Sequence, residues 1–431
     1  MHALAVGHTD VGKVRDHNED YYLIDENLKT YIVCDGMGGH AAGEVASQLA
    51  ATTTLNNLRK QASFLDTFDN SKEACEQLTE IVKDSVLDAC REVYDLAQTK
   101  PECKGMGTTL TMLMVAGKRG VLAHVGDSRL YLRRENKIYK LSVDHTLMAE
   151  LLAQGVPLEE LQRGRFATAN VLTRAVGKDE SVKVDILLFD VLPHDTFLLC
   201  SDGLSSVSNP VELENFLAIN NVSLIPQQLI DLANKRDGSD NITTVVVRID
   251  PEPINQKEEQ QWTTEIQLRI DILQQIYLFN HVTFRELSKL MSVMQIVECS
   301  PGDTIIQEGS TSNQLYILLE GKLEVSRGEN SIRILEAGQH VGEMALLSDQ
   351  PRSATVRVLE NSRLLFAERD TLFGLMREEP AIGVKLLWNL SRGLSVRLDE
   401  TNMQMFGPIN VADNNIEDTL RFTPLPPSEE S

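Results

Sequence analysis

Short apolar runs bounded by Gly, Asp or Asn recur through the first 250 residues. Runs of this kind, rich in β-branched side chains, predict buried strands that end in turns. We expect strands at 30–34, 109–115, 121–125, 129–132, 184–188, 196–200 and 242–249. Apolar positions at helical spacing predict helices within residues 43–98. Strands that outnumber two long helices favour an α+β domain built in layers.

The pattern changes after residue 250. The segment 251–261, PEPINQKEEQQ, is polar and contains two prolines, which is typical of a linker. Beyond it, strand-like runs separated by glycines indicate a small antiparallel jelly roll, with strands at 315–319, 322–325, 332–335 and 354–358. Helical patterns flank these runs at 272–295 and 381–402. We therefore expect domains over 1–250 and 262–405, followed by a disordered acidic tail over 406–431.

Composition narrows the classes of function. A length of 431 residues suits two or three domains. The net charge of −22 argues against nucleic acid or an anionic membrane as a partner. We find no apolar stretch of about 18 residues and no basic leader before an apolar core, so we expect a soluble, cytoplasmic protein. The six cysteines lack CxxC spacing, which predicts reduced thiols.

Acidic residues stand at the ends of several predicted strands. Asp35 and Asp202 each precede a glycine after an apolar run, Asp127 follows the run 121–125, and Asp240 precedes the last run. If these strands lie side by side, the acids meet at one rim. Carboxylate oxygens select Mg or Mn over zinc. Two such ions about 3.5 to 4 Å apart can clamp a phosphate and acidify a water molecule.

Each of these elements also has a plain structural interpretation. An Asp-Gly pair is more often a simple turn than a ligand, Asp127 could lie at a hairpin tip, and Asp240 could only start a strand. Arg15 can hold a phosphate through two parallel hydrogen bonds, but the nearby segment 18–20 could be a solvated loop. Five such sequence elements occur in one order within the first 250 residues, which favours the interpretation as a metal and phosphate site.

That order resembles a known family. The motifs GKVRDHNED (12–20), DGMGG (35–39), GTT (107–109), GDSR (126–129), SDGL (201–204) and DN (240–241) resemble those of metal-dependent PPM-type serine/threonine phosphatases, the type 2C family. The resemblance covers about residues 3–250. It implies a β-sandwich flanked by helices, a binuclear Mg/Mn centre, and hydrolysis of phosphoserine and phosphothreonine in a protein substrate.

The resemblance also implies roles for individual residues. Asp35 would bridge both metal ions, with Glu19 and the carbonyl of Gly36 on one ion and Asp202 and Asp240 on the other. All the acids of the motif series are present, which predicts an active enzyme.

The remaining roles concern the water and the substrate. By the same resemblance, Asp20 would orient metal-bound water, Arg15 would bind the substrate phosphate, and Asp127 would help hold a third metal. One departure affects the general acid: animal members carry a histidine where this chain has Met37, and a thioether cannot donate a proton. His40 and metal-bound water are the candidates that remain. The stretch 145–170 would correspond to a variable flap beside the active site.

The second domain contains a candidate anion site within HVGEMALLSDQPRSATV, residues 340–356. A helical turn that starts near Gly342 presents backbone N–H groups to an anion, and Arg352 adds a charged clamp. Glu343 beside an anion is unfavourable unless it accepts a hydrogen bond from a sugar hydroxyl, so phosphate and ribose together indicate a nucleotide. The alternative is a Glu343–Arg352 salt bridge across an ordinary turn.

This segment is similar to the phosphate-binding cassette of cyclic nucleotide-binding domains. The resemblance implies that Gly342, Glu343 and Ala345 contact the ribose and phosphate, that Arg352 contacts the cyclic phosphate, and that Ser353 and Ala354 complete the pocket. The ligand would be cyclic AMP or cyclic GMP. The residue that caps the base would lie on the C-terminal helix, near Arg392.

Two functional hypotheses follow. The first is a serine/threonine phosphatase whose activity is set by a cyclic nucleotide. The second is a constitutive phosphatase whose C-terminal domain is a degenerate nucleotide-binding fold that docks partners. A cyclic-nucleotide-dependent transcription factor is disfavoured, because the residues after Met405 are too few for a helix-turn-helix. The C-terminal helix, with Leu386, Leu387, Leu390 and Leu394, could pair two chains into a homodimer or pack on the jelly roll.

Overall fold

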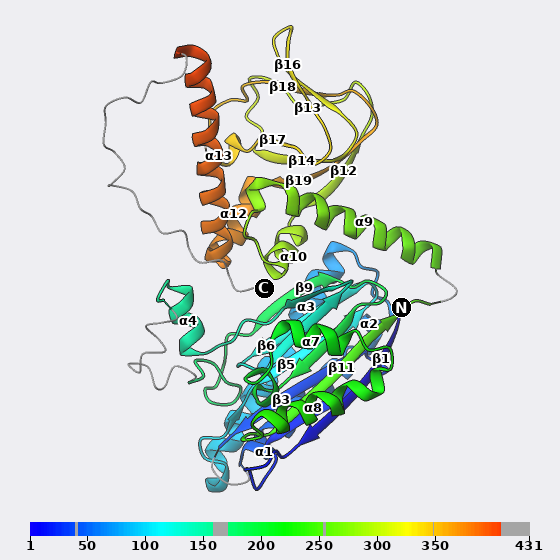
Figure 1. The fold of residues 1–431 in the computed structure, drawn as a ribbon, viewed down its shortest axis with the longest axis vertical. Coiled ribbons are helices and arrows are strands. Elements are labelled where there is room, and N and C mark those ends of the chain that lie inside the picture. The colour runs from blue at the N-terminus through cyan, green and yellow to red at the C-terminus, as the bar shows by residue number, and fades with distance from the viewer. Residues whose placement is uncertain (39–41, 158–170, 253–255, 348, 407–431) are drawn as a thin grey trace. The chain divides into compact units, whose positions relative to one another are not determined.

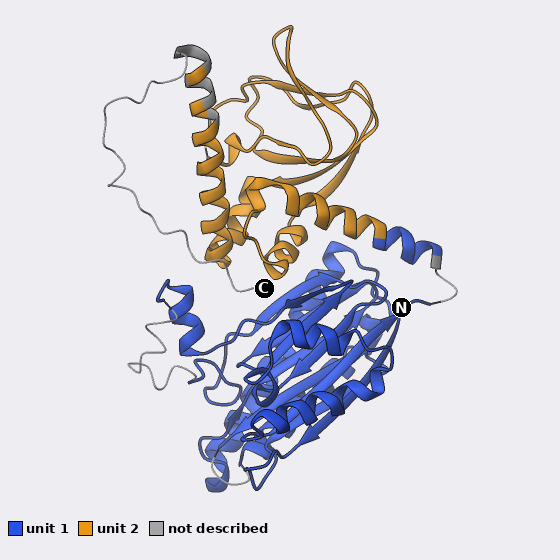
Figure 2. Ribbon diagram, in the orientation of Figure 1, with its two compact units in different colours: residues 1–263, 430–431 blue, residues 264–429 orange. Residues whose placement is uncertain are grey.

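The computed structural model describes residues 1–38, 42–157, 171–252, 256–347 and 349–406. The chain divides into two compact units, with the boundary between residues 263 and 264 (Figure 2). Unit 1 contains the predicted first domain, and unit 2 contains the predicted jelly roll.

Unit 1 is built on two antiparallel sheets. One has the order β1-β11-β10-β7-β8 and the other β2-β3-β5-β6-β9, with β4 paired to β3. The strands of the first are β1 His2–Asp10, β11 Ile242–Asp250, β10 Thr196–Cys200, β7 Arg129–Arg134 and β8 Lys137–Lys140. Those of the second are β2 Asp20–Asp25, β3 Thr30–Met37, β4 Gly107–Thr108, β5 Leu110–Ala116, β6 Arg119–Val125 and β9 Asp185–Asp190.

Helices cover the outer face of each sheet (Figure 1). The second sheet is covered by α1 Ala42–Arg59 and α3 Lys72–Thr99, and the first by α7 Pro210–Leu217 and α8 Ile225–Arg236. Shorter helical segments are α2 Ala62–Asp66, η1 Pro101–Cys103, α4 Leu147–Ala153, α6 Asp202–Ser205 and η3 Val222–Leu224. Local sequence explains where these helices begin. Ser71 caps α3, and Asn209 with Glu212 forms a capping box before α7, whose first residue is a proline.

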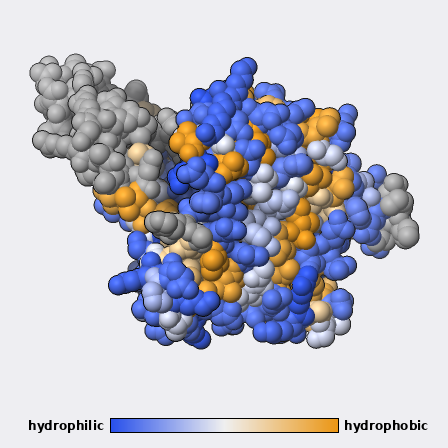
Figure 3. Space-filling view, turned by 90° about the horizontal axis from the view of Figure 1, so that it is seen from below, coloured by the Kyte–Doolittle hydropathy of each residue, from blue (hydrophilic) through white to orange (hydrophobic). Residues whose placement is uncertain are grey.

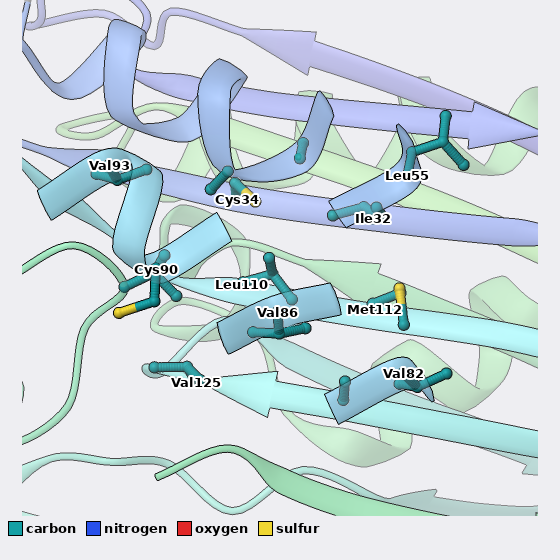
Figure 4. Packing of buried hydrophobic residues seen from close by; sticks show 14 of the residues in the cluster. Ile32, Cys34, Leu55, Val82, Val86, Cys90, Val93, Leu110, Met112 and Val125 are labelled. Carbon is teal, nitrogen blue, oxygen red and sulfur yellow. The ribbon is translucent and has the colours of Figure 1, made fainter. Parts of the chain in front are cut away.

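The cores of unit 1 follow the alternation of side chains along the strands. On β3, Ile32 and Cys34 pack in one cluster with Val86 and Cys90 of α3 (Figure 4). Because side chains alternate along a strand, Tyr31 and Val33 point to the opposite face of the sheet. All the β3 residues from Tyr31 to Cys34 are buried. Burial on both faces requires a covering layer on each side of the sheet, which is the reason for the helix–sheet–sheet–helix arrangement.

Unit 2 contains two four-stranded sheets with the orders β12-β19-β14-β17 and β13-β18-β15-β16. The strands are β12 Gln295–Cys299, β13 Thr304–Ile306, β14 Gln314–Glu320, β15 Leu323–Arg327, β16 Asn330–Leu335, β17 His340–Val341, β18 Thr355–Val358 and β19 Ser362–Glu368. Its helical segments are η4 Tyr277–Phe279, α10 Phe284–Ser292, α11 Met344–Leu347, α12 Arg369–Glu378 and α13 Pro380–Phe406. Leu318, Leu323, Val356 and Leu364 lie in the core between the sheets.

The predicted α+β class is confirmed, and each strand predicted by number has a counterpart. The strands β1, β2, β4 and β8 of unit 1 and β12, β17 and β19 of unit 2 were not predicted. The expected arrangement of the acids in neighbouring strands is corrected: β3 and β6 lie in one sheet, and β10 and β11 lie in the other.

Two other expectations need correction. Helix α9, Gln256–Gln275, begins inside the segment expected to be a linker. Glu, Gln and Lys favour helices, and the prolines at 251 and 253 precede the helix. The helix expected over 272–295 is interrupted, because η4 and α10 are separate and β12 starts at Gln295. Apart from Phe406, the predicted tail lies outside the described residues.

The described helices include none that is long and apolar enough to cross a membrane. The face drawn in Figure 3 is mostly hydrophilic, with apolar patches that are separated from one another.

A buried ion pair stabilises unit 1 and yields a first prediction. Arg134 donates from Nε and Nη2 to the two oxygens of Asp195, at 2.8 and 2.7 Å, and both side chains are buried. Arg134→Met leaves the Asp195 charge uncompensated, so we expect unit 1 to lose about 3–5 kcal/mol of unfolding free energy. Urea unfolding can be followed by Trp262 fluorescence in a Trp388→Phe background.

The matched control removes an exposed pair. Lys72 lies 3.9 Å from Glu76, and both side chains are exposed to solvent. Lys72→Met should leave the unfolding midpoint of unit 1 unchanged. Equal effects of the two substitutions would contradict a stabilising role for the buried pair.

Candidate functional site

The acids predicted as ligands gather at one end of unit 1. Antiparallel pairing of β2 with β3 places Asp20 opposite Asp35. Cys200, at the end of β10, pairs with Thr244 near the start of β11, so Asp202 and Asp240 lie beside each other at the same end. Turns that belong to two different sheets thus deliver these side chains to one rim.

Asp35 lies at the centre of this cluster. Burial raises its pKa well above the ordinary value, and Asp20, Asp202, Asp127 and Asp240 raise it further. Its backbone is fixed: the N–H donates to Thr109 Oγ1 at 2.9 Å, and the carbonyl accepts from Thr108 Oγ1 at 2.9 Å. The GTT motif therefore holds the position of Asp35.

Asp20 is buried, with 6% of its surface exposed. Ser201 donates from Oγ to Asp20 Oδ2 at 2.7 Å, and Ser201 Oγ accepts from the Thr243 N–H at 2.9 Å. Burial raises the pKa of Asp20 to about 7, although the hydrogen bonds from Ser201 and Thr243 oppose the shift. The alternative interpretation of segment 18–20 was a solvated loop. Asp20 is instead a buried carboxylate that is oriented by hydrogen bonds.

Glu19, just before β2, is held through its backbone by residues of β3 and α1 and by Asn241. Its carbonyl accepts from the Gly36 N–H at 3.1 Å and from Ser47 Oγ at 2.7 Å, and its own N–H donates to Asn241 Oδ1 at 2.8 Å. A Cβ on Gly36 would lie 2.1 Å from the carbonyl oxygen of Gly43, so the chain needs glycine there. Burial raises the pKa of Glu19, and Arg15 lowers it.

Arg15 and Asp127 complete the set. Arg15 Nη2 lies 2.8 Å from Asp240 Oδ2, and the Arg15 side chain is 47% exposed. Asp127 follows Gly126, whose φ of +110° favours glycine. Burial raises the pKa of Asp127 to about 7, and Asp202 contributes to the increase. Arg15 is thus an exposed cation beside a cluster of buried and half-buried acids.

The donor set fits divalent cations with oxygen ligands. Glu19 Oε1, Asp20 Oδ1 and Asp202 Oδ1 are buried and have no hydrogen-bond partner among the described residues. Buried carboxylates without compensation are unfavourable, and cations would satisfy them. Carboxylates and a carbonyl are the ligands that Mg and Mn prefer.

The side chains are not already closed around an ion. Within the described ranges, no group of three or more His, Cys, Asp or Glu side chains is arranged to hold a metal ion. The chemistry of the donors nevertheless fits Mg and Mn.

Sequence reasoning gave no role to several residues that position the acids. The amide of Asn241 donates from Nδ2 to the carbonyls of Val11 and His17, at 2.9 and 3.0 Å, while its Oδ1 holds Glu19. Ser201 and Thr109 act similarly on Asp20 and Asp35. All three residues stand inside the quoted motifs, and that was the available signal.

The general acid stays without an assignment. Met37 ends β3 and pairs with Gly107, so a thioether does lie where a proton donor was expected. His40, the candidate replacement, lies outside the described residues.

In unit 2, Arg352 is buried and held by three polar groups. Its Nε donates to Ser312 Oγ at 2.9 Å, Nη1 to the Gly342 carbonyl at 3.2 Å, and Nη2 to the Gln314 carbonyl at 2.6 Å. Gly342 has a φ of +95°, and a Cβ there would lie 2.8 Å from Arg352 Nη1. The predicted glycine and arginine therefore lie against each other.

The other predicted nucleotide contacts surround this pair. Burial lowers the pKa of Arg352, whereas nearby Tyr316 and Glu343 raise it. Glu343 and Ala345 are buried, Ser353 is exposed and Ala354 is half-buried. The proximity of Glu343 suits either a nucleotide pocket or the alternative of an ion pair.

Comparison with known proteins identifies both units. A model described as protein phosphatase 2C matches residues 9–239, which is more than half of the chain. The chain belongs to the protein phosphatase 2C family. A model of the cyclic nucleotide-binding domain matches residues 296–379. The chain is thus a metal-dependent serine/threonine phosphatase that also carries a cyclic nucleotide-binding domain.

The bacterial relatives compared next match the phosphatase part of the chain. A serine/threonine phosphatase of Listeria welshimeri is 35% identical over 243 residues, covering 56% of this chain and 93% of the relative. The solved structure of the Streptococcus agalactiae serine/threonine phosphatase has a TM-score of 0.52 and 28% identity, covering 58% of this chain and 100% of that one. Staphylococcus aureus Stp1 has a TM-score of 0.50 and 31% identity, with coverages of 57% and 95%.

The raised pKa values predict how pH affects this phosphatase without metal. Asp20 and Asp127 have an ordinary pKa of 3.8 and a folded-state pKa of about 7. The folded state therefore binds more protons than the unfolded state between these values, and stability falls as pH rises through this window. We expect the melting temperature in EDTA to decrease between about pH 5 and about pH 8.

Two controls isolate the acidic cluster. The double variant Asp20→Asn, Asp127→Asn should show a flatter pH dependence, because neither amide titrates. Saturating Mn should also remove the fall in the wild type. An unchanged slope in the double variant would show that other groups cause the dependence.

Proposed function

We propose that this phosphatase hydrolyses phosphoserine and phosphothreonine in a partner protein, and that a cyclic nucleotide bound to unit 2 sets its activity. The observation that carries the catalytic part is the acidic cluster, in which Glu19, Asp20 and Asp202 each have one buried oxygen without a hydrogen-bond partner among the described residues. A buried set of this kind is unfavourable for structure alone, which supports a role as a cation site.

The proposed metal ligands are those of the family resemblance. Asp35 would be shared by two Mg or Mn ions, with Glu19 and the Gly36 carbonyl on one side and Asp202 and Asp240 on the other. Asp127 would contribute to a third, weaker site. When bound, the ions neutralise phosphate charge and lower the pKa of a water molecule.

The protein's own groups supply orientation and charge. Arg15 lies at the exposed edge of the cluster, where its guanidinium can donate two hydrogen bonds to a phosphate. Its present partner Asp240 is also partly exposed, so the side chain can turn to a substrate without leaving a buried charge. Asp20 would accept a hydrogen bond from the attacking water, while Ser201 fixes its other oxygen.

Two substitutions test this assignment. Asp35→Asn should reduce Mn-dependent hydrolysis of p-nitrophenyl phosphate by roughly 10²- to 10³-fold, because the shared carboxylate is lost. Arg15→Ala should lower kcat/KM for a phosphothreonine peptide about 10- to 100-fold, the loss expected for a charge-assisted phosphate contact.

Lys13→Ala is the matched control for Arg15, since Lys13 is a neighbouring exposed cation. Its kcat/KM should equal that of the wild type. If Lys13→Ala and Arg15→Ala lose activity equally, Arg15 acts only through general positive charge. If Asp35→Asn retains its Mn-dependent rate, the metal assignment is wrong.

Regulation by a nucleotide is supported by the geometry around Arg352. The guanidinium is buried, oriented by Ser312 and two carbonyls, and lies against a glycine with positive φ. A degenerate docking scaffold, the alternative function, has no need of an oriented buried cation. This contrast favours a cyclic nucleotide, either cyclic AMP or cyclic GMP.

Helix α9 offers a route for the signal, because it crosses the boundary between the units. Within unit 1, Trp262 donates to the Val191 carbonyl at 3.3 Å, and Lys118 Nζ lies 5.0 Å from the Trp262 ring. Within unit 2, Ile266 and Leu273 are buried and belong to the same helix. We propose that α9 transmits nucleotide binding to the catalytic unit.

Binding and transmission can be separated by mutation. Arg352→Ala should weaken cyclic nucleotide binding by about 100-fold or more, measured by calorimetry, because the phosphate loses its charged partner. Arg357→Ala, an exposed arginine on β18, is the matched control and should bind normally.

Trp262→Ala should bind nucleotide with the wild-type Kd and keep the basal phosphatase rate, but lose the change in rate on adding nucleotide. A full response in Trp262→Ala would rule out the contacts of Trp262 as the route of the signal. Absence of binding in the wild type to both nucleotides would favour the docking scaffold.

Partners and location extend the proposal. The charge of −22 and the free cysteines of the chain suit a cytoplasmic protein that does not bind nucleic acid or membrane. On α13, Leu386 and Leu390 are buried, whereas Val384, Leu387 and Trp388 are exposed. We propose that the exposed stripe pairs two chains as a homodimer.

A further inference from the structure

His145 is a buried residue that contacts Gly126 in two ways. The His145 backbone N–H donates to the Gly126 carbonyl at 2.7 Å, and the Gly126 N–H donates to His145 Nδ1 at 3.1 Å. Only 3% of the His145 surface is exposed. On the other side of the ring, Arg174 Nη1 lies 3.1 Å from His145 Nε2, so an N–H donor faces each ring nitrogen.

The opposite side of the ring faces a second group of residues. His145 Nε2 lies 3.4 Å from Asp185 Oδ2 at the start of β9, and Asp185 Oδ1 accepts from Arg174 Nη1 at 2.9 Å. The His145 carbonyl accepts from the Thr173 N–H at 2.9 Å. His145 therefore connects the Gly126 turn with β9 and with the chain around residues 173–174.

The turn that His145 holds is conformationally demanding. Gly126 has a φ of +110°, and a Cβ there would lie 2.5 Å from Thr109 Cγ2. Two residues further on, Ser128 Oγ lies 2.8 Å from Thr109 Oγ1. The same Thr109 oxygen accepts a hydrogen bond from the Asp35 N–H at 2.9 Å. A displacement of the turn would thus reach both Asp127 and Asp35.

We propose that His145 is a positioning residue, which fixes the Gly126–Asp127 turn through Nδ1 so that the Asp127 carboxylate serves the metal chemistry. The inference rests on the proposed function, because Asp127 needs a precise place only if it helps hold a cation. In the sequence, His145 marked only the border of a variable segment, and no role was predicted for it. Residues that orient a metal ligand without touching the metal commonly change metal affinity or activity 10- to 100-fold.

A pair of amide substitutions separates the two sides of the ring. His145→Asn places an amide oxygen near Nδ1 and can keep the Gly126 bond, whereas His145→Gln reaches toward Nε2 and gives up that bond. We expect His145→Gln to need about tenfold more Mn for half-maximal hydrolysis of p-nitrophenyl phosphate, and His145→Asn to stay within about twofold of wild type.

His124 supplies the matched control. It is buried, its ring centroid lies 4.8 Å from that of His145, and its ring nitrogens contact Thr111 Oγ1 and the Val143 carbonyl instead of Gly126. His124→Asn and His124→Gln should leave the Mn requirement unchanged, whatever their effect on melting temperature. Equal shifts for the two His145 variants, or a shift as large at His124, would overturn the proposal in favour of simple packing.

A second measurement needs no activity. In the metal-free protein, amide hydrogen exchange at Gly126 should be faster in His145→Gln than in His145→Asn, because only the latter keeps an acceptor. Equal exchange would refute the hold on the turn. If the wild type lacks Mn-dependent hydrolysis, the proposed function fails, and the exchange result still decides whether His145 holds Gly126.

Discussion

Mutual repulsion among buried carboxylates is the constraint on which the catalytic unit depends. Asp35 has its pKa raised by burial and by the neighbouring acids Asp20 and Asp202. Such a cluster lowers stability unless cations compensate it, so the fold must hold it by other means. The two cores of unit 1 and a network of Thr, Ser and Asn hydrogen bonds provide that hold, and the site needs side chains from both sheets.

The same constraint explains why polar groups surround the acids at fixed positions. Thr109, Ser201 and Asn241 each bond to the backbone or carboxylate of one acid, at 2.7 to 2.9 Å. Gly36 and Gly126 occur where a side chain would collide with a neighbouring element. The site therefore combines each acid with a residue that positions it. This combination makes the motifs more specific than isolated Asp-Gly pairs.

In unit 1 the sequence predicted the interior of the fold better than its borders, whereas in unit 2 the interior strand β19 was missed. Strands buried on both faces, such as β3 and β10, have continuous apolar runs that can be recognised. The strands β1, β2 and β8 escaped prediction because they lie at sheet edges, where side chains are only partly buried and the apolar signal is weak. The acids were expected to meet at one rim if their strands lay side by side. Which sheet carries each acid depends on pairing between segments that are distant in the sequence, and no local pattern encodes that pairing.

Helix α9 shows how a polar sequence can still be structural. Its first turns read as a linker because Gln, Lys and Glu dominate them, yet Glu259 is buried 3.4 Å from the N-terminal ammonium of Met1 and Trp262 bonds to Val191. Later turns place Ile266 and Leu273 in buried positions. The burial of Glu259, Ile266 and Leu273 therefore marks α9 as part of the folded structure, which the polar composition of its first turns conceals.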